Sequence, residues 1–119
     1  MKKPKILLVE DEESFQFLLE MTLSEEYEII QAKTYAEAEK AFSLHKEELD
    51  VIIMDRNLGP RTTDSLVEDI RKSGFSKPMI AFSGSGDSRK KQMELGCSDE
   101  LPKTASKKEV IEKLNSIIK

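Results

Sequence analysis

The sequence predicts an α/β fold, a doubly wound, five-stranded parallel sheet with five helices. One observation is that short apolar runs recur along the chain, most clearly within residues 5–9, where Ile6 to Val9 follow Lys5, and at residues 51–54. Such runs are too short for free-standing helices and are typical of strands buried on both faces. The other observation is that segments with apolar residues at helical spacing separate these runs. Strand and helix alternate five times, which indicates a parallel sheet with helices on both faces.

Length and composition indicate one domain over residues 1–119, with 38% hydrophobic and 35% charged residues. The net charge of -4 argues against nucleic-acid binding within this chain, which would need clustered positive charge. Cys97 is the single cysteine, so an internal disulfide is excluded and we expect a small core residue. No apolar run approaches the roughly 20 residues of a membrane helix, and no signal peptide follows Met1. We therefore expect a cytoplasmic protein without a membrane partner.

The other strands are expected at residues 27–32, 78–82 and 98–101. The first of these mixes apolar and polar side chains and is typical of a strand near an edge. Pro78 opens the second, at a position where a missing N–H is tolerated. The third is short and weakly apolar, so its pattern alone is the least decisive of the five.

Caps and apolar faces define the helices. Capping boxes at Thr34–Glu37 and Ser106–Glu109 open the second and the last helix, and Gly74 is typical of the residue past a helix C-terminus. The side chains expected to form the apolar faces of the helices are Phe15, Leu18, Leu19, Leu23, Ala36, Ala38, Ala41, Phe42, Leu44, Leu66, Val67, Ile70, Met93, Leu95, Val110, Ile111, Leu114, Ile117 and Ile118.

The strand order determines where polar residues meet. Right-handed crossovers restrict the topology, and the flavodoxin-like order 2-1-3-4-5 places the switch point between the first and third strands. These two strands end in Glu10-Asp11 and in Asp55. Taken alone, Asp55 is equally typical of a residue that caps the next turn. In open α/β sheets, however, ligands bind beyond the carboxyl ends of the strands, so the three carboxylates are expected to converge.

Three neighbouring carboxylates repel one another and lose hydration. Either one of them is protonated, with a raised pKa, or a hard cation lies between them. Oxygen ligands in a half-open site favour Mg²⁺, which would neutralise a phosphoryl oxygen. Ser83 and Lys103 end the fourth and fifth strands and could both donate to such an oxygen. Together these residues predict a phosphoryl site with a carboxylate nucleophile.

At this point the chain resembles a known family, the receiver domain of bacterial two-component response regulators. The resemblance covers essentially the whole chain. It rests on four pieces in the same order and spacing: Lys5-Ile-Leu-Leu-Val-Glu-Asp11, Asp50-Val-Ile-Ile-Met-Asp55, Pro78-Met-Ile-Ala-Phe-Ser83 and Leu101-Pro-Lys103.

The resemblance implies that Asp55 accepts a phosphoryl group from a phosphohistidine on a sensor histidine kinase or a histidine phosphotransfer protein. Asp11, Asp55 and the backbone carbonyl of Asn57 would bind Mg²⁺, with Glu10 helping through water. Lys103 would pair with the phosphoryl group.

The resemblance also implies that Ser83 moves toward the phosphoryl group. The signal would pass to a downstream protein through the surface of the fourth helix, fifth strand and fifth helix. The aspartyl phosphate would hydrolyse in place, so the chain is expected to be a signalling module and not an enzyme with turnover.

Several residues depart from the family pattern. Glu100 stands where receivers commonly carry an aromatic switch residue. Thr104 follows Lys103, where Pro is usual, often after a cis bond. A cis bond before a non-proline residue costs about 2.5–4 kcal/mol, so we expect a trans loop or a strained exception. The loop at residues 58–63 looks longer than usual and the segment 84–95 shorter. Arg56 replaces an apolar residue, and we expect it to be solvated in preference to pairing with an acid.

Two other functions stay open at this stage. Glu100 and Thr104 suit a binding module that keeps the fold but signals without phosphorylation. A Mg²⁺-dependent phosphatase would use a similar strand-end Asp, but it needs a second Asp two residues later as acid and base, and Asn57 stands there. The single histidine, His45, has no partner motif and is expected at a surface helix end.

Overall fold

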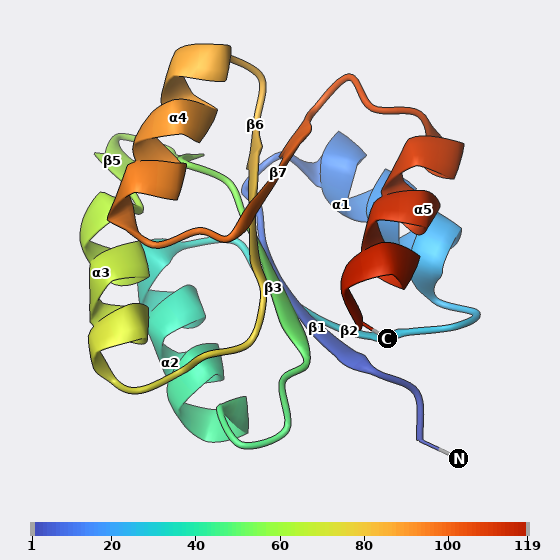
Figure 1. Cartoon of the computed structure of the whole chain (residues 1–119), viewed down its shortest axis with the longest axis horizontal. Coiled ribbons are helices and arrows are strands. Elements are labelled where there is room, and N and C mark those ends of the chain that lie inside the picture. Colours follow the sequence, from blue (N-terminus) through green and yellow to red (C-terminus); the bar gives the residue numbers. More distant parts are fainter. Residues whose placement is uncertain (1, 119) are drawn as a thin grey trace.

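The computed structural model describes residues 2–118 and contains the predicted five-stranded parallel sheet (Figure 1). Its strands lie in the order β2-β1-β3-β6-β7, which is 2-1-3-4-5 when the strands of this sheet are counted along the chain, so the predicted topology is confirmed. In chain order they are β1 (Lys5–Val9), β2 (Glu28–Ala32), β3 (Val51–Met54), β6 (Met79–Ser83) and β7 (Asp99–Pro102).

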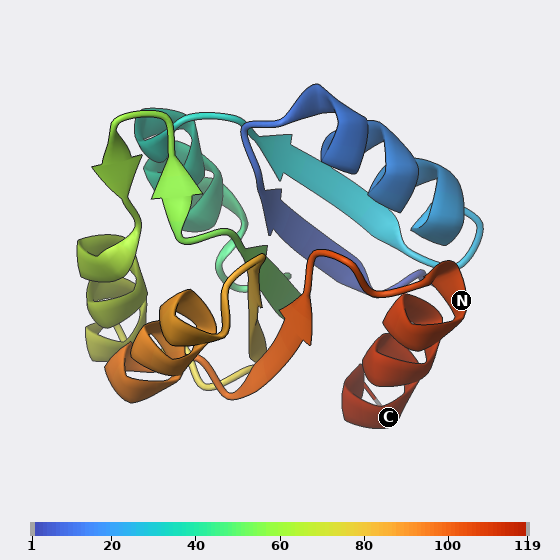
Figure 2. The same cartoon turned by 90° about the horizontal axis from the view of Figure 1, so that it is seen from above.

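Five helices cover the two faces of the sheet, as predicted. Helices α2, α3 and α4 lie on one face and α1 and α5 on the other, with the sheet between them (Figures 1 and 2). Their bounds are α1 (Glu13–Leu23), α2 (Tyr35–His45), α3 (Asp64–Lys72), α4 (Gly86–Leu95) and α5 (Lys107–Ile118).

The unbroken apolar runs have a direct explanation in this three-layer arrangement. Successive strand residues point to opposite faces. On β1, Leu7 and Val9 join the core beneath α2 and α3, whereas Ile6 and Leu8 join the core beneath α1 and α5. Because both faces are covered, every residue of the run must be apolar. Each such side chain contributes about 1.5–3 kcal/mol through burial, which fixes the sheet that carries the site.

Both predicted capping boxes form, one of them in a shifted version. The Ser106 hydroxyl accepts from the Glu109 N–H at 3.2 Å, and the Glu109 carboxylate accepts from the Ser106 N–H at 2.9 Å. Thr34 likewise accepts from the Glu37 N–H at 3.1 Å. The Glu37 carboxylate, however, accepts from the N–H of Lys33, one residue before the cap. Either way an otherwise unpaired N–H at the helix start is satisfied.

Three of the residues expected on apolar helix faces are exposed. Leu18 is 41% exposed, Leu44 is 69% exposed and Ala36 is also exposed, so these assignments are wrong. Helix α1 instead buries Gln16, Leu19 and Leu23. That stripe follows the i, i+3, i+7 spacing and is narrow, so Leu18 falls outside it although it is next to Leu19 in the sequence.

A small hairpin occupies what the sequence analysis predicted to be only a loop. Strand β4 (Asn57–Leu58) pairs antiparallel with β5 (Arg61–Thr62). Gly59 lies in the turn with φ 60°, a conformation that favours glycine. The hairpin returns the chain to the start of α3, beside the end of β3. Among residues 2–118, no helix has the length and apolar character needed to cross a bilayer.

Candidate functional site

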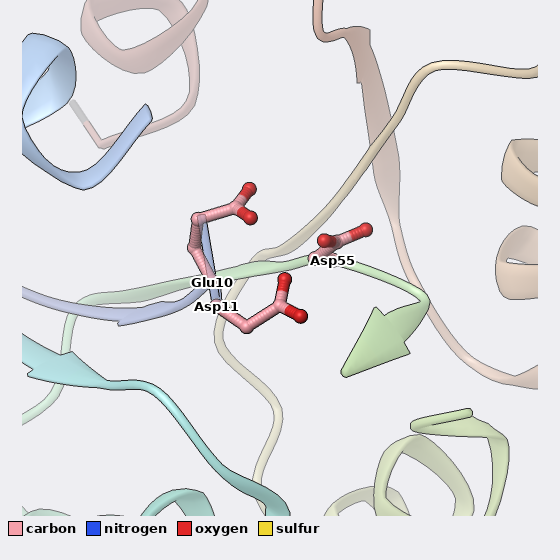
Figure 3. A group of neighbouring side chains, drawn as sticks. All are labelled: Glu10, Asp11 and Asp55. Atoms are coloured by element: carbon pink, nitrogen blue, oxygen red, sulfur yellow. The ribbon is translucent and has the colours of Figure 1, made fainter. Parts of the chain in front are cut away.

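The carboxyl ends of β1 and β3 bring three acidic side chains together. Val9 is paired with Met54, and the Asp55 N–H donates to the Val9 carbonyl at 3.0 Å, so both strands end at the same level. Glu10, Asp11 and Asp55 each offer an oxygen that lies within 4.8 Å of the others (Figure 3). The convergence that the strand order predicted is therefore present in the structure.

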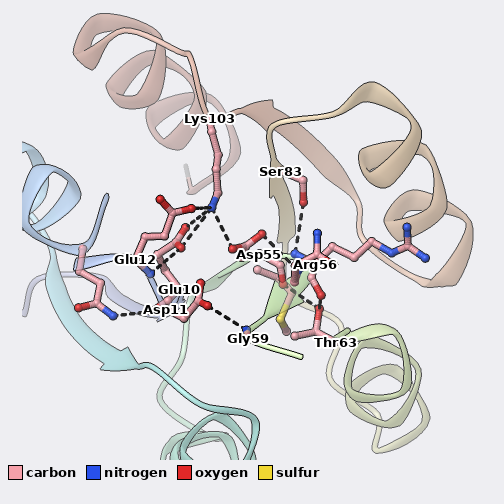
Figure 4. Close-up of polar contacts among 12 residues, drawn as sticks. Glu10, Asp11, Glu12, Asp55, Arg56, Gly59, Thr63, Ser83 and Lys103 are labelled. Atoms are coloured by element: carbon pink, nitrogen blue, oxygen red, sulfur yellow. Dashed lines mark hydrogen bonds and ion pairs between the residues drawn. The ribbon is translucent and has the colours of Figure 1, made fainter. Parts of the chain in front are cut away.

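Lys103 reaches this cluster from the end of β7, two strands away from β3. Its Nζ lies 2.9 Å from Oδ2 of Asp55, 3.0 Å from Oε1 of Glu10 and 3.3 Å from Oε1 of Glu12 (Figure 4). The Nζ also lies 4.7 Å from the ring centroid of Phe15. Acid groups and the face of an aromatic ring both attract an ammonium ion, so the lysine is held over the strand ends.

Burial controls the charges of the two innermost groups. Loss of hydration raises the pKa of the fully buried Glu10 to about 7, although hydrogen bonds from the Glu12 N–H and from Lys103 act in the opposite direction. For Lys103, burial by itself would lower the pKa. Its hydrogen bonds to Asp55 and Glu10 outweigh that effect and raise the pKa above its usual value. The site therefore contains a permanent ammonium ion beside a carboxyl group that titrates near neutral pH.

The donor set fits a hard divalent cation. One ammonium group pairs with Glu10, Glu12 and Asp55, and Asp11 lies beside them, so the four acidic side chains outnumber the single cation. Within residues 2–118, the buried Oε1 of Glu10 has the ion pair with Lys103 at 3.0 Å but accepts no hydrogen bond of regular geometry. The chain thus has an acidic cluster that could hold a metal, and its oxygen-only ligands are those that Mg²⁺ prefers.

A cavity of about 390 Å³ opens above the cluster. Asp11, Asp55, Asn57, Ser83 and Lys103 all line it, so every residue predicted for the site except Glu10 faces one space. The Gly59 N–H donates to Oδ2 of Asp11 at 2.9 Å and orients that carboxylate. The cavity could admit a phosphoryl group between the acids and the lysine.

Ser83 lies at the end of β6 and is 2% exposed. Its hydroxyl donates to Oε1 of Gln92 at 2.7 Å and accepts from the Arg56 N–H at 3.2 Å. The hydroxyl is therefore beside the cavity, but its hydrogen is donated to Gln92 on α4.

The interpretation of Arg56 as a solvated side chain is wrong. Its Nε and Nη2 donate to the two carboxylate oxygens of Asp64 at 3.0 and 2.9 Å. The hairpin between these residues brings the start of α3 beside Arg56, and the planar guanidinium matches both carboxylate oxygens. The side chain consequently points to α3 and not into the cavity.

Glu100 and Thr104 also depart from the family pattern, and the structure shows how each is accommodated. The Glu100 side chain is 51% exposed and pairs with Arg89 on α4, with 2.9 Å between Oε1 and Nε. Residues 2–118 contain no cis peptide bond, so the bond between Lys103 and Thr104 is trans, which is the first of the two expected alternatives. The loop after Lys103 thus avoids the strain of a cis bond.

Sequence reasoning missed three buried polar residues that hold the backbone of the site. The Thr63 hydroxyl donates to the Asp55 carbonyl at 2.7 Å, the Gln92 amide donates to the Met54 carbonyl at 2.8 Å, and the Gln16 amide donates to the Glu10 carbonyl. Polar residues of these types are mostly exposed, so nothing in the local sequence marks Thr63 or Gln92. Gln16 could have been found, because its spacing from Leu19 and Leu23 puts it on the buried stripe of α1.

His45 and Cys97 lie outside the site, as expected. His45 ends α2, 3.7 Å from a carboxylate oxygen of Glu48, and is not part of the acidic cluster. Cys97 is buried in the core beneath α2 and α3. Burial raises the pKa of its thiol to about 12, so the thiol stays protonated and unreactive at neutral pH.

Comparison with known proteins identifies the family. The model of the response regulator receiver domain matches residues 6–115, which include nearly all of the strands and of the five helices. The chain belongs to this family. It is therefore a receiver domain of a two-component system, and receiver domains are signalling modules.

The receiver domain has relatives among longer proteins. It is 32% identical over 120 residues to the probable transcriptional regulator ycf27 of Guillardia theta, covering 98% of this chain and 46% of the relative. It is 30% identical over 123 residues to the protein of the same name from Porphyridium aerugineum, covering 100% of this chain and 50% of the relative. The chain thus spans about half the length of these relatives.

Solved structures agree with the fold. The non-phosphorylated HemR receiver domain from Leptospira biflexa is 30% identical and superposes with a TM-score of 0.85, covering 98% of this chain and 94% of that chain. The chemotaxis protein CheY4 of Vibrio cholerae has the same TM-score at 23% identity, covering 98% of this chain and 99% of that chain, which shows the shared fold alone.

Proposed function

We propose that Asp55 accepts a phosphoryl group from a phosphohistidine on a sensor histidine kinase or a histidine phosphotransfer protein. The observation that carries this proposal is the position of Lys103, whose Nζ lies 2.9 Å from Oδ2 of Asp55 over an acidic cavity. A carboxylate oxygen would attack phosphorus, the P–N bond would break, and the imidazole would leave with the electron pair. The products are an acyl phosphate on Asp55 and a free histidine on the donor.

Each residue of the site has its own role in the proposed phosphoryl transfer. Asp55 is the nucleophile, and Lys103 stabilises negative charge on the phosphoryl oxygens. Asp11, Asp55 and the backbone carbonyl of Asn57 would hold Mg²⁺, with Glu10 acting through a water molecule. When bound, this ion would neutralise the charge of the phosphoryl group. Ser83 would donate its hydroxyl hydrogen to a phosphoryl oxygen.

The phosphorylated state would last only until water hydrolyses the acyl phosphate. The domain would therefore signal for a limited time and would not be an enzyme with turnover. We propose that a downstream protein recognises the surface formed by α4, β7 and α5 at the β7 edge of the sheet (Figure 1). Ser83 ends β6, the strand paired with β7, and Lys103 directly follows β7. The relatives described above are called probable transcriptional regulators. Their names favour gene regulation as the process that this receiver domain controls.

Beryllofluoride, a mimic of a phosphoryl group on a carboxylate, tests the proposal. In the presence of Mg²⁺, beryllofluoride at about 100 times its Kd should raise the melting temperature by about 10 °C through ligand linkage. Asp55→Asn should show no shift. Asp69→Asn, the same change on the exposed face of α3, should behave as wild type. An equal shift in Asp55→Asn, or no shift in wild type, would reject phosphorylation at Asp55.

A second function keeps the fold but dispenses with phosphorylation. The observation that favours it is that Glu100 is exposed and paired to Arg89, so no aromatic ring is present there to couple Ser83 to the surface. Under this alternative, a downstream partner would bind wild type and Asp55→Asn with equal affinity. Binding that depends on beryllofluoride would exclude it.

A further inference from the structure

The single hydrogen of the Ser83 hydroxyl is already engaged before any phosphoryl group arrives. The hydroxyl donates this hydrogen to Oε1 of Gln92 at 2.7 Å and accepts from the Arg56 N–H at 3.2 Å. A serine hydroxyl has a single hydrogen to donate. It therefore cannot donate to Gln92 and to a phosphoryl oxygen on Asp55 at the same time.

Gln92 is held firmly in the position where it receives this hydrogen bond. It is fully buried, and its Nε2 donates to the Met54 carbonyl at 2.8 Å. Met54 precedes Asp55 and ends β3. One amide group on α4 thus connects the strand that carries the nucleophile to the strand that carries Ser83. Rotation of the Gln92 side chain would break both bonds together.

A second residue on α4 lies one turn away and reaches the surface. Arg89 donates from Nη1 to the Ser83 carbonyl at 2.7 Å and from Nε to Oε1 of Glu100 at 2.9 Å. Residues at i and i+3 share a helix face, so Arg89 and Gln92 contact the same residue of β6. Hydrogen bonds therefore run without a gap from the Met54 carbonyl through Gln92, Ser83 and Arg89 to the exposed Glu100.

We propose that Gln92 is a positioning residue that holds the Ser83 hydroxyl away from Asp55 until Asp55 is phosphorylated; this rests on the function proposed above. Phosphorylation moves the hydroxyl hydrogen from Gln92 to a phosphoryl oxygen. Oε1 of Gln92 then becomes a buried acceptor without a donor, which is unfavourable. The side chain or the helix must adjust, and Arg89 on the same face carries the change to Glu100.

A thermodynamic cycle on beryllofluoride binding, followed by calorimetry in Mg²⁺, tests this role. Gln92→Met keeps a similar length but offers Ser83 no amide oxygen, so the phosphoryl mimic no longer competes for the hydroxyl. We expect binding about five-fold tighter than wild type, the worth of one hydrogen bond. In a Ser83→Ala background, Gln92→Met should have no effect on affinity. Gln31→Met, which removes a glutamine amide from β2, should bind as wild type.

The outcomes separate this inference from the proposed function. If wild type does not bind beryllofluoride, both fail. If wild type binds and Gln92→Met binds equally, or if the tighter binding persists without the Ser83 hydroxyl, the inference is overturned and the proposed function stands. A merely structural role for Gln92 would change the melting temperature but would not depend on Ser83.

Nuclear magnetic resonance of wild type gives a second readout if Gln92→Met does not fold. Beryllofluoride should shift the side-chain resonances of the Gln92 amide and of the Arg89 Nε–H in wild type. In Ser83→Ala, which retains Asp55 and Lys103, these shifts should be lost. Equal shifts in the two proteins would contradict the proposal.

Discussion

The two halves of the carboxyl edge of the sheet are built in different ways. At the ends of β1 and β3, the acids form a charged cluster with Lys103, which reaches over from the end of β7, and each of these residues stands at or just after a strand end. At the ends of β6 and β7, neutral hydrogen bonds through Ser83 and Gln92 lead to an exposed ion pair of Arg89 with Glu100. We call the first group, the acids with Lys103, the reacting half, and the second group, Ser83, Gln92, Arg89 and Glu100, the transmitting half. The residues of the reacting half are determined by their positions at strand ends. Those of the transmitting half are determined by which side chains pair in the folded protein.

The largest effect is expected from removing the cation of the reacting half. Lys103→Met leaves the buried carboxylates of Glu10 and Asp55 without their ion-pair partner. Breaking a buried ion pair leaves the remaining charge buried without a partner. We therefore expect the free energy of unfolding to decrease by about 2 kcal/mol in metal-free buffer. Phosphorylation of Asp55 should slow by about 100-fold or more.

Urea denaturation and phosphorylation by acetyl phosphate would measure these effects. Lys108→Met, which removes an exposed lysine of α5, is the matched control and should change neither quantity. Unchanged phosphorylation in Lys103→Met would show that the reacting half does not depend on its ammonium ion.

A smaller effect is expected from pH, and it also belongs to the reacting half. Burial raises the pKa of Glu10 to about 7, so between pH 4.5 and 7 the folded protein binds more protons than the unfolded chain. The free energy of unfolding should therefore decrease by about 2 kcal/mol as pH rises through this range without Mg²⁺. The groups facing Glu10 are Lys103, Asp55, Asp11 and Glu12, and Lys103 stays charged throughout.

Glu10→Gln isolates this effect, because it keeps the shape of the side chain and removes its titration. Chemical denaturation in a chelator at several pH values should give a flatter profile for the variant. The same profile in both proteins would assign the pH dependence to other groups.

The smallest effect is expected from the exposed pair in the transmitting half. Glu100→Gln removes the partner of Arg89, and exposed ion pairs contribute about 0–1 kcal/mol. We expect the melting temperature to change by only a few degrees and beryllofluoride affinity to stay within about two-fold of wild type. Calorimetry would measure both. A loss of beryllofluoride binding in Glu100→Gln would show that the reacting half depends on the Arg89–Glu100 pair.

The difference between the two halves also explains which features could be predicted from the sequence. The strands and the convergence of Glu10, Asp11 and Asp55 followed from apolar runs that end in acids, because parallel strands end at one edge. The pairing of Arg56 with Asp64 could not be predicted, since it depends on a hairpin that brings the start of α3 beside Arg56. Gln92 was missed for a different reason. A polar residue on a weakly apolar helix gives no sign that its side chain is buried.

The misplaced leucines show the limit of periodicity itself. Leu18 and Leu19 are adjacent apolar residues of one helix, and only the packing of α1 against the sheet decides which one is covered. The width of a buried stripe is a property of the neighbouring elements and not of the helix alone.

The backbone of Asp55 is restrained on both sides. Its N–H donates to the Val9 carbonyl at 3.0 Å, and its carbonyl accepts from the Thr63 hydroxyl at 2.7 Å. The residue that would change covalently thus has little freedom to shift its own main chain. Any displacement caused by the added group has to be taken up across the cavity, where Gly84 and Ser85 form an exposed, small-residue connection between β6 and α4. Shortening or stiffening that connection would leave chemistry at Asp55 intact while suppressing the structural response to it.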